Sequence, residues 1–393
     1  MKPVLRTKLC ELLGIEYPIC LAGMGSRGKA TPARLVAAVS EAGGIGIIGG
    51  SGLPAEELRR VIREVRTMTT KPIGVDLLLP ATLADAPPTR SSVRKELAQR
   101  YPQHVAFVRR LFADYGLPDV FVENEVVVTQ TVNADHGGLA GEGAQGATPH
   151  EQQVEVLLEE DVQVFAAGLG DPSTIVPRAH RKGMVVMGLA GTVRNAERHL
   201  AAGVDIVVSQ GYEAGGHTGS IANFPLIPQI VDVARPKPVI AAGGIVDGRG
   251  VAAALALGAI GAWVGTAFLV SDECDIPELS KQQILKGRSQ DFVVSRIYTG
   301  KTMRGYKNEV IDAWSKSGLD ALPMPYQKVL MDDFNEAAAQ LDRHDLRSNP
   351  AGQGAGMISR RRPAREIMEE LVDSTVRTLA SLRADVTISI PTR

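Results

Sequence analysis

Short apolar runs alternate along the chain with longer, Ala-rich segments of helical periodicity. Most runs end in Gly, Ala or a polar residue and lead directly into a helical segment, which is typical of parallel strands joined by crossover helices. Eight runs predict strands, at Pro18–Ala22, Gly46–Gly49, Ile73–Leu78, Val162–Ala167, Met184–Leu189, Asp205–Ser209, Pro238–Ala242 and Gly261–Gly265. Repeated strand–helix units of this kind predict an α/β fold, a (β/α)8 TIM barrel.

The helical segments between these runs reinforce the prediction. They lie at Pro32–Ala42, Ala55–Arg66, Pro172–Lys182, Val193–Ala202, Ile227–Ala234 and Gly250–Leu257. Four helices are followed by a glycine, at Gly43, Gly183, Gly203 and Gly258. A residue that tolerates positive φ is favoured just after a helix end, so these glycines predict where the helices stop.

Two segments interrupt the repeat. Residues 80–150 begin in a proline-rich turn and include a glycine-rich stretch, which is typical of a lid or an inserted subdomain. Residues 273–393 read as mainly helical, with an amphipathic last helix from Pro363 to Leu382. The predicted division is 1–79 for strands one to three, 80–150 for the insertion, 151–272 for strands four to eight, and 273–393 for the C-terminal part. We expect the two interruptions to lie together over or beside the barrel mouth.

Composition and charge limit the partners. Apolar residues make up 44% of the chain and charged residues 22%, as in an ordinary globular protein. The net charge of −1 provides no field to attract nucleic acid or an acidic membrane. Aromatic residues, at 4%, are too few to predict stacking platforms for single strands. We therefore expect a small-molecule substrate, with no nucleic-acid or membrane partner.

The cysteines and the N-terminal region predict a cytoplasmic protein. Cys10, Cys20 and Cys274 are odd in number and lack the close spacing of a zinc site, so a reducing compartment and no metal are expected. Glu11 and Glu16 interrupt the N-terminal apolar stretch, which excludes a secretory signal pattern. No stretch approaches the roughly 18 apolar residues of a membrane span.

Glycine-rich turns follow the last two predicted strands. Ala242-Gly243-Gly244 ends strand seven, and Val264-Gly265-Thr266 ends strand eight. Barrels of this class often hold a phosphate after these two strands. Glycines let backbone N–H groups approach a phosphate, a helix N-terminus adds partial positive charge, and a Thr hydroxyl adds a donor. Neither turn contains Lys or Arg, so backbone amides would hold most of the phosphate.

The run after strand six, Ser209 to Gly219, reads SQGYEAGGHTG. It carries His217 on a glycine-rich loop at the catalytic end of the barrel. An imidazole with an ordinary pKa near 6.5 suits a general base at neutral pH. Gln210, at the strand end, could offer its amide to a polar ring edge. The other histidines, His104, His136, His150, His180, His199 and His344, are taken as surface or packing residues.

These motifs carry a family resemblance. The N-terminal LLGIEYPI, AAVSEAGGIG from Ala37, GVDLLLP from Gly74, SQGYEAGGHTG, AAGGIVDGRG, GTAFL, YTGKTMRG from Tyr298 and AGQGAGMI from Ala351 resemble the nitronate monooxygenases, formerly called 2-nitropropane dioxygenases. The resemblance runs from about residue 9 to 271 and resumes at Tyr298. It implies a flavoprotein with noncovalent FMN that oxidises alkyl nitronates with O2, giving a carbonyl compound and nitrite.

The resemblance also implies roles for individual residues. Carried over position by position, the cofactor contacts are Ala22, Gly23, Met24, Asp76, Gln210, Gly215, Gly216, Gly243, Gly244, Trp263, Val264, Gly265 and Thr266, and His217 matches the active-site histidine. Three positions depart from the common pattern. Gly23 replaces a proline, Asp76 replaces an asparagine, and strand four ends in Phe165-Ala166-Ala167-Gly168 where a number of relatives have a second histidine.

Three functions remain open from the sequence. The first is nitronate monooxygenase activity with FMN and O2. The second is an NAD(P)H-dependent flavin reductase of the enoyl-thioester or quinone type on the same barrel. The third, from another class, is a non-catalytic protein that binds a phosphorylated ligand. A homodimer is compatible with the sequence, which determines neither the oligomeric state nor the physiological substrate.

Overall fold

The structure, a computed structural model, describes residues 3–25, 28–79, 90–119 and 149–385. Eight parallel strands form the central sheet: β1 (Ile19–Leu21), β2 (Gly46–Gly49), β3 (Ile73–Leu78), β4 (Val164–Leu169), β5 (Val185–Ala190), β6 (Ile206–Gln210), β8 (Val239–Ala242) and β9 (Ala262–Val264). The order β1-β9-β8-β6-β5-β4-β3-β2 follows the chain around the sheet. The (β/α)8 barrel predicted from the sequence is therefore confirmed. Each predicted strand begins and ends within two residues of the bounds of an observed strand.

The sheet closes on itself between its first and second strands. Cys20 and Ile45 form a parallel bridge. The Leu21 N–H donates to the Ile45 carbonyl at 2.9 Å, and the Ile45 N–H donates to the Ile19 carbonyl at 3.1 Å. Closure of this kind leaves no open edge in the barrel sheet, and because the eight strands are parallel, their C-terminal ends meet at one end of the barrel.

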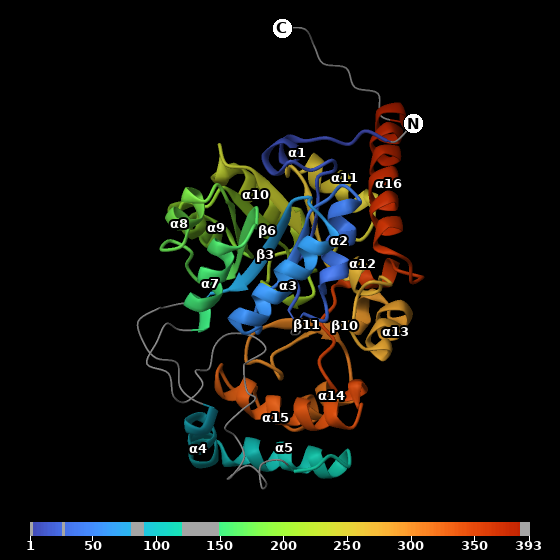
Figure 1. The fold of residues 1–393 in the computed structure, drawn as a ribbon. Coiled ribbons are helices and arrows are strands. Elements are labelled where there is room, and N and C mark those ends of the chain that lie inside the picture. The colour runs from blue at the N-terminus through green and yellow to red at the C-terminus, as the bar shows by residue number, and fades with distance from the viewer. Residues whose placement is uncertain (1–2, 26–27, 80–89, 120–148, 386–393) are drawn as a thin grey trace.

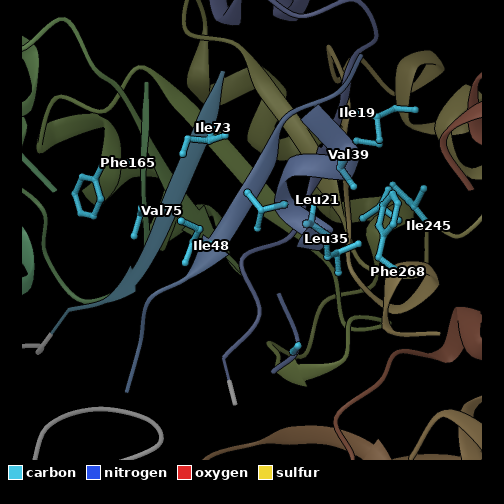
Figure 2. Packing of buried hydrophobic residues seen from close by; sticks show 14 of the residues in the cluster. Ile19, Leu21, Leu35, Val39, Ile48, Ile73, Val75, Phe165, Ile245 and Phe268 are labelled. Carbon is cyan, nitrogen blue, oxygen red and sulfur yellow. The ribbon is translucent and has the colours of Figure 1, made fainter. Parts of the chain in front are cut away.

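Helices surround the barrel: α2 (Ala33–Glu41), α3 (Ala55–Met68), α7 (Pro149–Glu159), α8 (Val176–Arg181), α9 (Val193–Ala201), α10 (Asn223–Ala234) and α11 (Gly248–Ala256) (Figure 1). Short α12 (Thr266–Leu269) and α13 (Glu278–Lys286) follow β9. The glycines expected at helix ends all have positive φ, between 72° and 98°. The strand side chains alternate. Ile19 and Leu21 pack outward against the helices, as Figure 2 shows, whereas Cys20 points into the barrel.

One helix that the sequence analysis did not predict closes the far end of the barrel. Helix α1 (Lys8–Leu13) begins at Thr7, whose hydroxyl accepts from the Leu9 N–H, and ends at Gly14 with φ 66°. Leu9, Cys10 and Leu13 join the cluster of side chains inside the barrel. The barrel interior is thus sealed by α1 at this end.

The two interruptions of the repeat pack against each other. From the first, α4 (Arg90–Arg100) and α5 (Pro102–Asp114) lie against α14 (Glu309–Lys316) and α15 (Tyr326–Gln340) from the second, below the barrel in Figure 1. They share a separate hydrophobic core that includes Phe112, Trp314 and Phe334. We refer to α4, α5, α14 and α15 as the helical layer. The four segment boundaries predicted above stay a prediction, and much of the insertion lies outside the described residues.

The rest of the C-terminal part joins the barrel directly. The last helix, α16 (Ala364–Asp385), runs along the outside of the barrel beside α11 and α2 (Figure 1). Strands β10 (Phe292–Ser295) and β11 (Met303–Tyr306) form a small antiparallel sheet with β7 (Gly216–His217), which belongs to the loop after β6. None of these three short strands was predicted. They connect the predicted histidine loop to the C-terminal part.

Candidate active site

A cavity of about 850 Å³ lies at the C-terminal ends of the barrel strands. This volume falls within the range of roughly 300–1,000 Å³ that is usual for small-molecule and cofactor sites. The cavity is lined by every residue proposed from the sequence as a site residue except one: Ala22, Gly23, Met24, Asp76, Gln210, Gly215, Gly216, His217, Gly243, Gly244, Trp263, Gly265 and Thr266. The structure therefore brings together residues from the ends of five barrel strands, β1, β3, β6, β8 and β9.

The exception is Val264. Its side chain is fully buried among the residues between the strands and the helices, because it points outward from the barrel. Its carbonyl accepts a hydrogen bond from the Ala22 N–H at 2.8 Å. Val264 thus supports the strand-one loop from behind the cavity wall.

The turns after β8 and β9 form a cradle of backbone groups. Gly243 and Gly244 have φ of 98° and 71°, and a Cβ at Gly244 would lie 3.1 Å from the Glu213 Cβ. Helix α12 begins after Gly265 with no side-chain cap, so its first N–H groups face the cavity end of the strand. The N-terminus of α11 is different, because Asp247 accepts from the Arg249 and Gly250 N–H groups. An anion in the cradle would therefore meet loop amides and the start of α12.

A third glycine-rich segment completes this cradle, and the sequence analysis did not assign it to the site. The Gly352 N–H donates to Thr266 Oγ1 at 3.0 Å. The hydroxyl of Thr266 thus accepts one bond and keeps its own proton for a ligand. Gly354 lines the cavity and approaches Gly244 so closely that a Cβ there would lie 2.8 Å from the Gly244 carbonyl oxygen. The motif AGQGAGMI was noted for its resemblance, yet nothing local to it indicates a position beside β8.

His217 lies across the cavity wall on β7. It pairs with Met303 of β11, and its Nε2 lies 3.2 Å from Thr299 Oγ1. Because a hydroxyl both donates and accepts, this contact orients the ring without fixing which nitrogen carries the proton. The ring is half-buried and lines the cavity. Such a position suits a group that exchanges a proton with a bound molecule.

The loop that carries His217 is held from several directions. The Gln210 side-chain amide donates to the His217 carbonyl at 2.6 Å, so this amide nitrogen stabilises the loop. The fully buried Arg304 donates to the Tyr212 carbonyl and lies 4.4 Å from the centre of the Tyr212 ring. Thr302 donates to the Thr218 carbonyl at 2.9 Å. These bonds hold the histidine loop to the barrel and to the C-terminal part.

Asp76 is a buried carboxyl at the end of β3. Its side chain is 7% exposed and lines the cavity. Burial raises its pKa to about 8, since the carboxylate would lose its hydration and gain no counter-charge. A Cβ at Gly23 would collide with the Cβ of Asp76. Two of the departures noted in the sequence, Gly23 and Asp76, are therefore direct neighbours. The third departure is the end of β4, where a number of relatives have a second histidine. Here the strand carries Ala166 and Gly168, so it contributes no imidazole to the cavity wall.

The cavity carries an excess of positive charge that the sequence analysis missed. Lys29, Arg296, Lys301 and Arg347 line it, whereas Asp76 is the one acidic residue among the described residues of the lining. Three of the four cations come from the C-terminal part and reach the barrel mouth through the long-range packing of that part. An anionic ligand would be stabilised there.

Three further features of the described residues concern metal ligands, helix hydropathy and the cysteines. No group of three or more His, Cys, Asp or Glu side chains is placed to hold a metal ion in the part of the chain that the structure describes. Across the same residues, no helix is both long and apolar enough to cross a bilayer. The three cysteines are free thiols and buried.

Comparisons with known proteins extend over nearly the whole chain. The family model described as nitronate monooxygenase matches residues 6–374. A Mycobacterium tuberculosis protein described as a monooxygenase is 37% identical over 388 residues, covering 96% of this chain and 99% of its own. A Staphylococcus aureus protein named "Probable nitronate monooxygenase" is 31% identical over 379 residues, covering 94% of this chain and 97% of its own.

Solved structures show the same architecture. Nitroalkane oxidase from Streptomyces ansochromogenes aligns with a TM-score of 0.75 at 28% identity, covering 95% of this chain and 99% of that chain. FabK from Thermotoga maritima aligns with a TM-score of 0.72 at 29% identity, covering 97% of this chain and 100% of that chain. The barrel and the parts added to it are thus shared with both proteins.

Proposed function

The chain belongs to the nitronate monooxygenase family, and on that premise we propose that it is an FMN-dependent enzyme that oxidises alkyl nitronates or nitroalkanes with O2 to a carbonyl compound and nitrite. Because it belongs to this family, the protein is a flavin-dependent oxidoreductase. The choice of FMN, of the substrate and of each residue's role is our proposal. A cytoplasmic location, which suits three buried thiols, is part of it.

One observation carries this proposal: a cradle of backbone N–H groups and a histidine share one cavity. The cradle at Gly243, Gly244 and Thr266 fits the phosphate of FMN, because backbone amides and a hydroxyl can surround three oxygens without a Cβ in the way. The cavity walls beyond it, from Ala22 to Met24 and at Trp263, would hold the ring. When bound, the flavin supplies the electron-transfer chemistry that the side chains lack.

The protein's own residues would position the substrate and handle its charge. We assign His217 the removal of the α-proton from a neutral nitroalkane, or the stabilisation of the anion once formed. The cations at the mouth, Lys301 among them, would draw the anionic nitronate into the cavity. Ala339 of α15 lines the cavity, so the helical layer would help to limit the access of water.

A second candidate is an NAD(P)H-dependent flavin reductase of the enoyl-thioester or quinone type. The structural similarity to FabK, an enoyl reductase, supports this second candidate. The same cavity cations would also suit the phosphates of a nicotinamide nucleotide. The third reading, a non-catalytic phosphate-ligand protein, is disfavoured by membership of an enzyme family.

An anaerobic mixing experiment separates the two enzymes. The purified protein is mixed with propyl-2-nitronate, and separately with NADH or NADPH, while the flavin absorbance is followed. We expect bleaching by the nitronate and none by the nucleotides. Rapid bleaching by a nucleotide alone would favour the reductase, and a colourless protein that takes up no FMN would exclude both.

The phosphate cradle predicts a selective loss of cofactor on Gly244→Ala. A Cβ at φ 71° strains the backbone and narrows the cradle beside Glu213, so FMN should bind at least about tenfold more weakly. Gly116→Ala is the matched control, since Gly116 has φ 66° and open space around it, far from the cavity. Fluorescence titration of the apoprotein with FMN measures both. Equal affinities in the two variants would place the phosphate elsewhere.

The positive charge at the mouth predicts a change in KM. Lys301 makes no ion pair with any residue that the structure describes, so Lys301→Met should raise the KM for an anionic nitronate about five- to tenfold and change kcat little. A cation that attracts substrate and transition state alike alters binding only. Exposed Lys8, on α1 at the sealed end, gives the control Lys8→Met. A fall in kcat at unchanged KM would instead give Lys301 a role in the chemical step.

A further inference from the structure

The side chain of Asp76 points toward the cavity because of its place in the alternation of β3. Val75 and Leu77 point outward into the core between strands and helices, so the alternation of β3 directs Asp76 inward. It lies at the cavity end of the strand, where it pairs with Gly49 on β2 and Ala166 on β4. A charged residue type therefore stands at the inner wall of the barrel, beside the cavity.

No described residue forms a hydrogen bond with this carboxyl. Its Oδ1 is sealed from solvent and has no partner, and it lies close to Gly168, where a Cβ would be only 3.0 Å away. A buried carboxylate without donors is costly, whereas the neutral acid costs far less. The carboxyl of Asp76 thus requires either a proton or a ligand that donates to it.

The surroundings of Asp76 provide no compensating charge. The positions packed against it from the strand-one loop, β2 and β4 are Gly23, Gly49, Ala166 and Gly168, none of which can ionise. Burial is the sole cause of its raised pKa, so neither His217 nor a cavity cation counteracts it. The local structure around Asp76 therefore raises its pKa and favours the neutral carboxylic acid over the carboxylate.

We propose that Asp76 is a neutral carboxylic acid in the resting enzyme and donates its proton in a hydrogen bond to an acceptor of the molecule bound in the cavity. This inference rests on the function proposed above, in which the bound molecule is FMN. The acceptor is then a carbonyl oxygen or an unprotonated nitrogen of the flavin ring. The cavity is the one direction from which an acceptor can approach, because the Oδ1 edge is closed by protein. Asp76 would then be a positioning group for the cofactor.

The opposite arrangement makes a different prediction. If Asp76 were an ionised acceptor for a ring N–H, higher pH would favour binding. As a donor, it loses the hydrogen bond when it ionises, and a charge is left in the cavity wall. FMN affinity should then weaken about tenfold between pH 7.5 and 9.5, where the FMN phosphate is already fully ionised, because ionisation of Asp76 competes with binding above about 8.

The binding test compares the wild-type protein with two variants. Asp76→Asn keeps a donor of the same shape and cannot ionise, so its FMN affinity should be close to that of wild type at pH 7 and flat to pH 9.5. Asp76→Leu removes the donor and should bind FMN about tenfold more weakly at pH 7. A wild-type affinity that is flat or rises with pH would overturn the proposal.

A second measurement needs no flavin. For a carboxyl whose folded pKa exceeds its unfolded pKa, the folded state holds more protons between the two values, so stability falls as pH rises toward about 8 and is level above it. The melting temperature of the apoprotein, relative to Asp76→Asn, should follow this course from pH 5.5 to 9.5. If the variant fails to fold, the infrared carboxylic C=O band of the wild type should still lose intensity as the pH rises through about 8.

These results separate the two proposals. A protein that takes up no FMN contradicts the proposed function and, with it, the bond to the ring, while the apoprotein measurement still decides whether Asp76 is neutral. A protein that binds FMN with no pH dependence overturns the donor role and leaves the function standing. A flat apoprotein profile overturns the neutral acid itself.

Discussion

Replacement of His217 by asparagine is expected to leave FMN bound and to lower kcat for a neutral nitroalkane about 10²- to 10⁴-fold. This is the usual contribution of a positioned general base. An asparagine amide can keep a hydrogen bond to Thr299 but cannot take a proton at neutral pH. The preformed nitronate needs no deprotonation, so its turnover should fall much less. Steady-state rates with both substrates measure the difference.

The comparison of the two substrates decides which role His217 has. An equal loss for nitroalkane and nitronate would make it a group that stabilises the anion, and unchanged rates would remove it from the mechanism. His180→Asn is the control, because His180 lies on the barrel exterior, where its Nε2 is 2.9 Å from Asp205 Oδ2. Its effect on either rate should be within about twofold.

The position of His217 was predictable from the sequence only in part. Its glycine-rich run after β6 indicated a catalytic loop, because the C-terminal ends of barrel strands share one face. The small sheet that fixes it was not predictable, since β7 has two residues and its partner β11 is more than 80 positions away. A two-residue strand carries no periodicity that a sequence pattern can detect.

The barrel strands could be predicted from the sequence, whereas the charge of the cavity could not. The eight strands were predictable because each is a short apolar run set between turn residues and a helix. The cations Arg296, Lys301 and Arg347 were not, because nothing near them in the sequence places them at the strand ends. The protonation of Asp76 depends on Gly23 and Gly168, which lie on other loops, so it also required the structure.

A substitution in the helical layer, Asp333→Ala, is expected to lower the stability of the protein strongly. Asp333 is fully buried on α15 and forms ion pairs with Arg90 and Arg94 of α4. Arg90 is itself 6% exposed, so Asp333→Ala would leave a buried guanidinium whose one remaining ion pair among the described residues is with Glu336. Breaking a buried pair by removing one partner typically costs about 3–5 kcal/mol. We expect a loss of this size in the free energy of unfolding, measured by denaturant titration.

Exposed charge provides the control for this substitution. Asp312→Asn removes the Lys307–Asp312 pair, whose side chains are 49% and 43% exposed, and should cost less than about 1 kcal/mol. Hydrogen exchange should show where the Asp333 variant loosens. We expect faster exchange in α4 and α15 and unchanged exchange in the barrel strands, since the helical layer has its own core. Uniform destabilisation would mean that barrel and layer unfold as one unit.

The Asp333 substitution should also reach the active site. Met303 lies in the core of the helical layer and pairs with His217, so one residue connects that core to the catalytic loop. A looser layer should let β7 move relative to the cradle, which lowers kcat without releasing FMN, because the cradle residues come from the barrel and the segment beside α12. Loss of FMN from Asp333→Ala, measured by gel filtration and absorbance, would show that the cradle too depends on the helical layer.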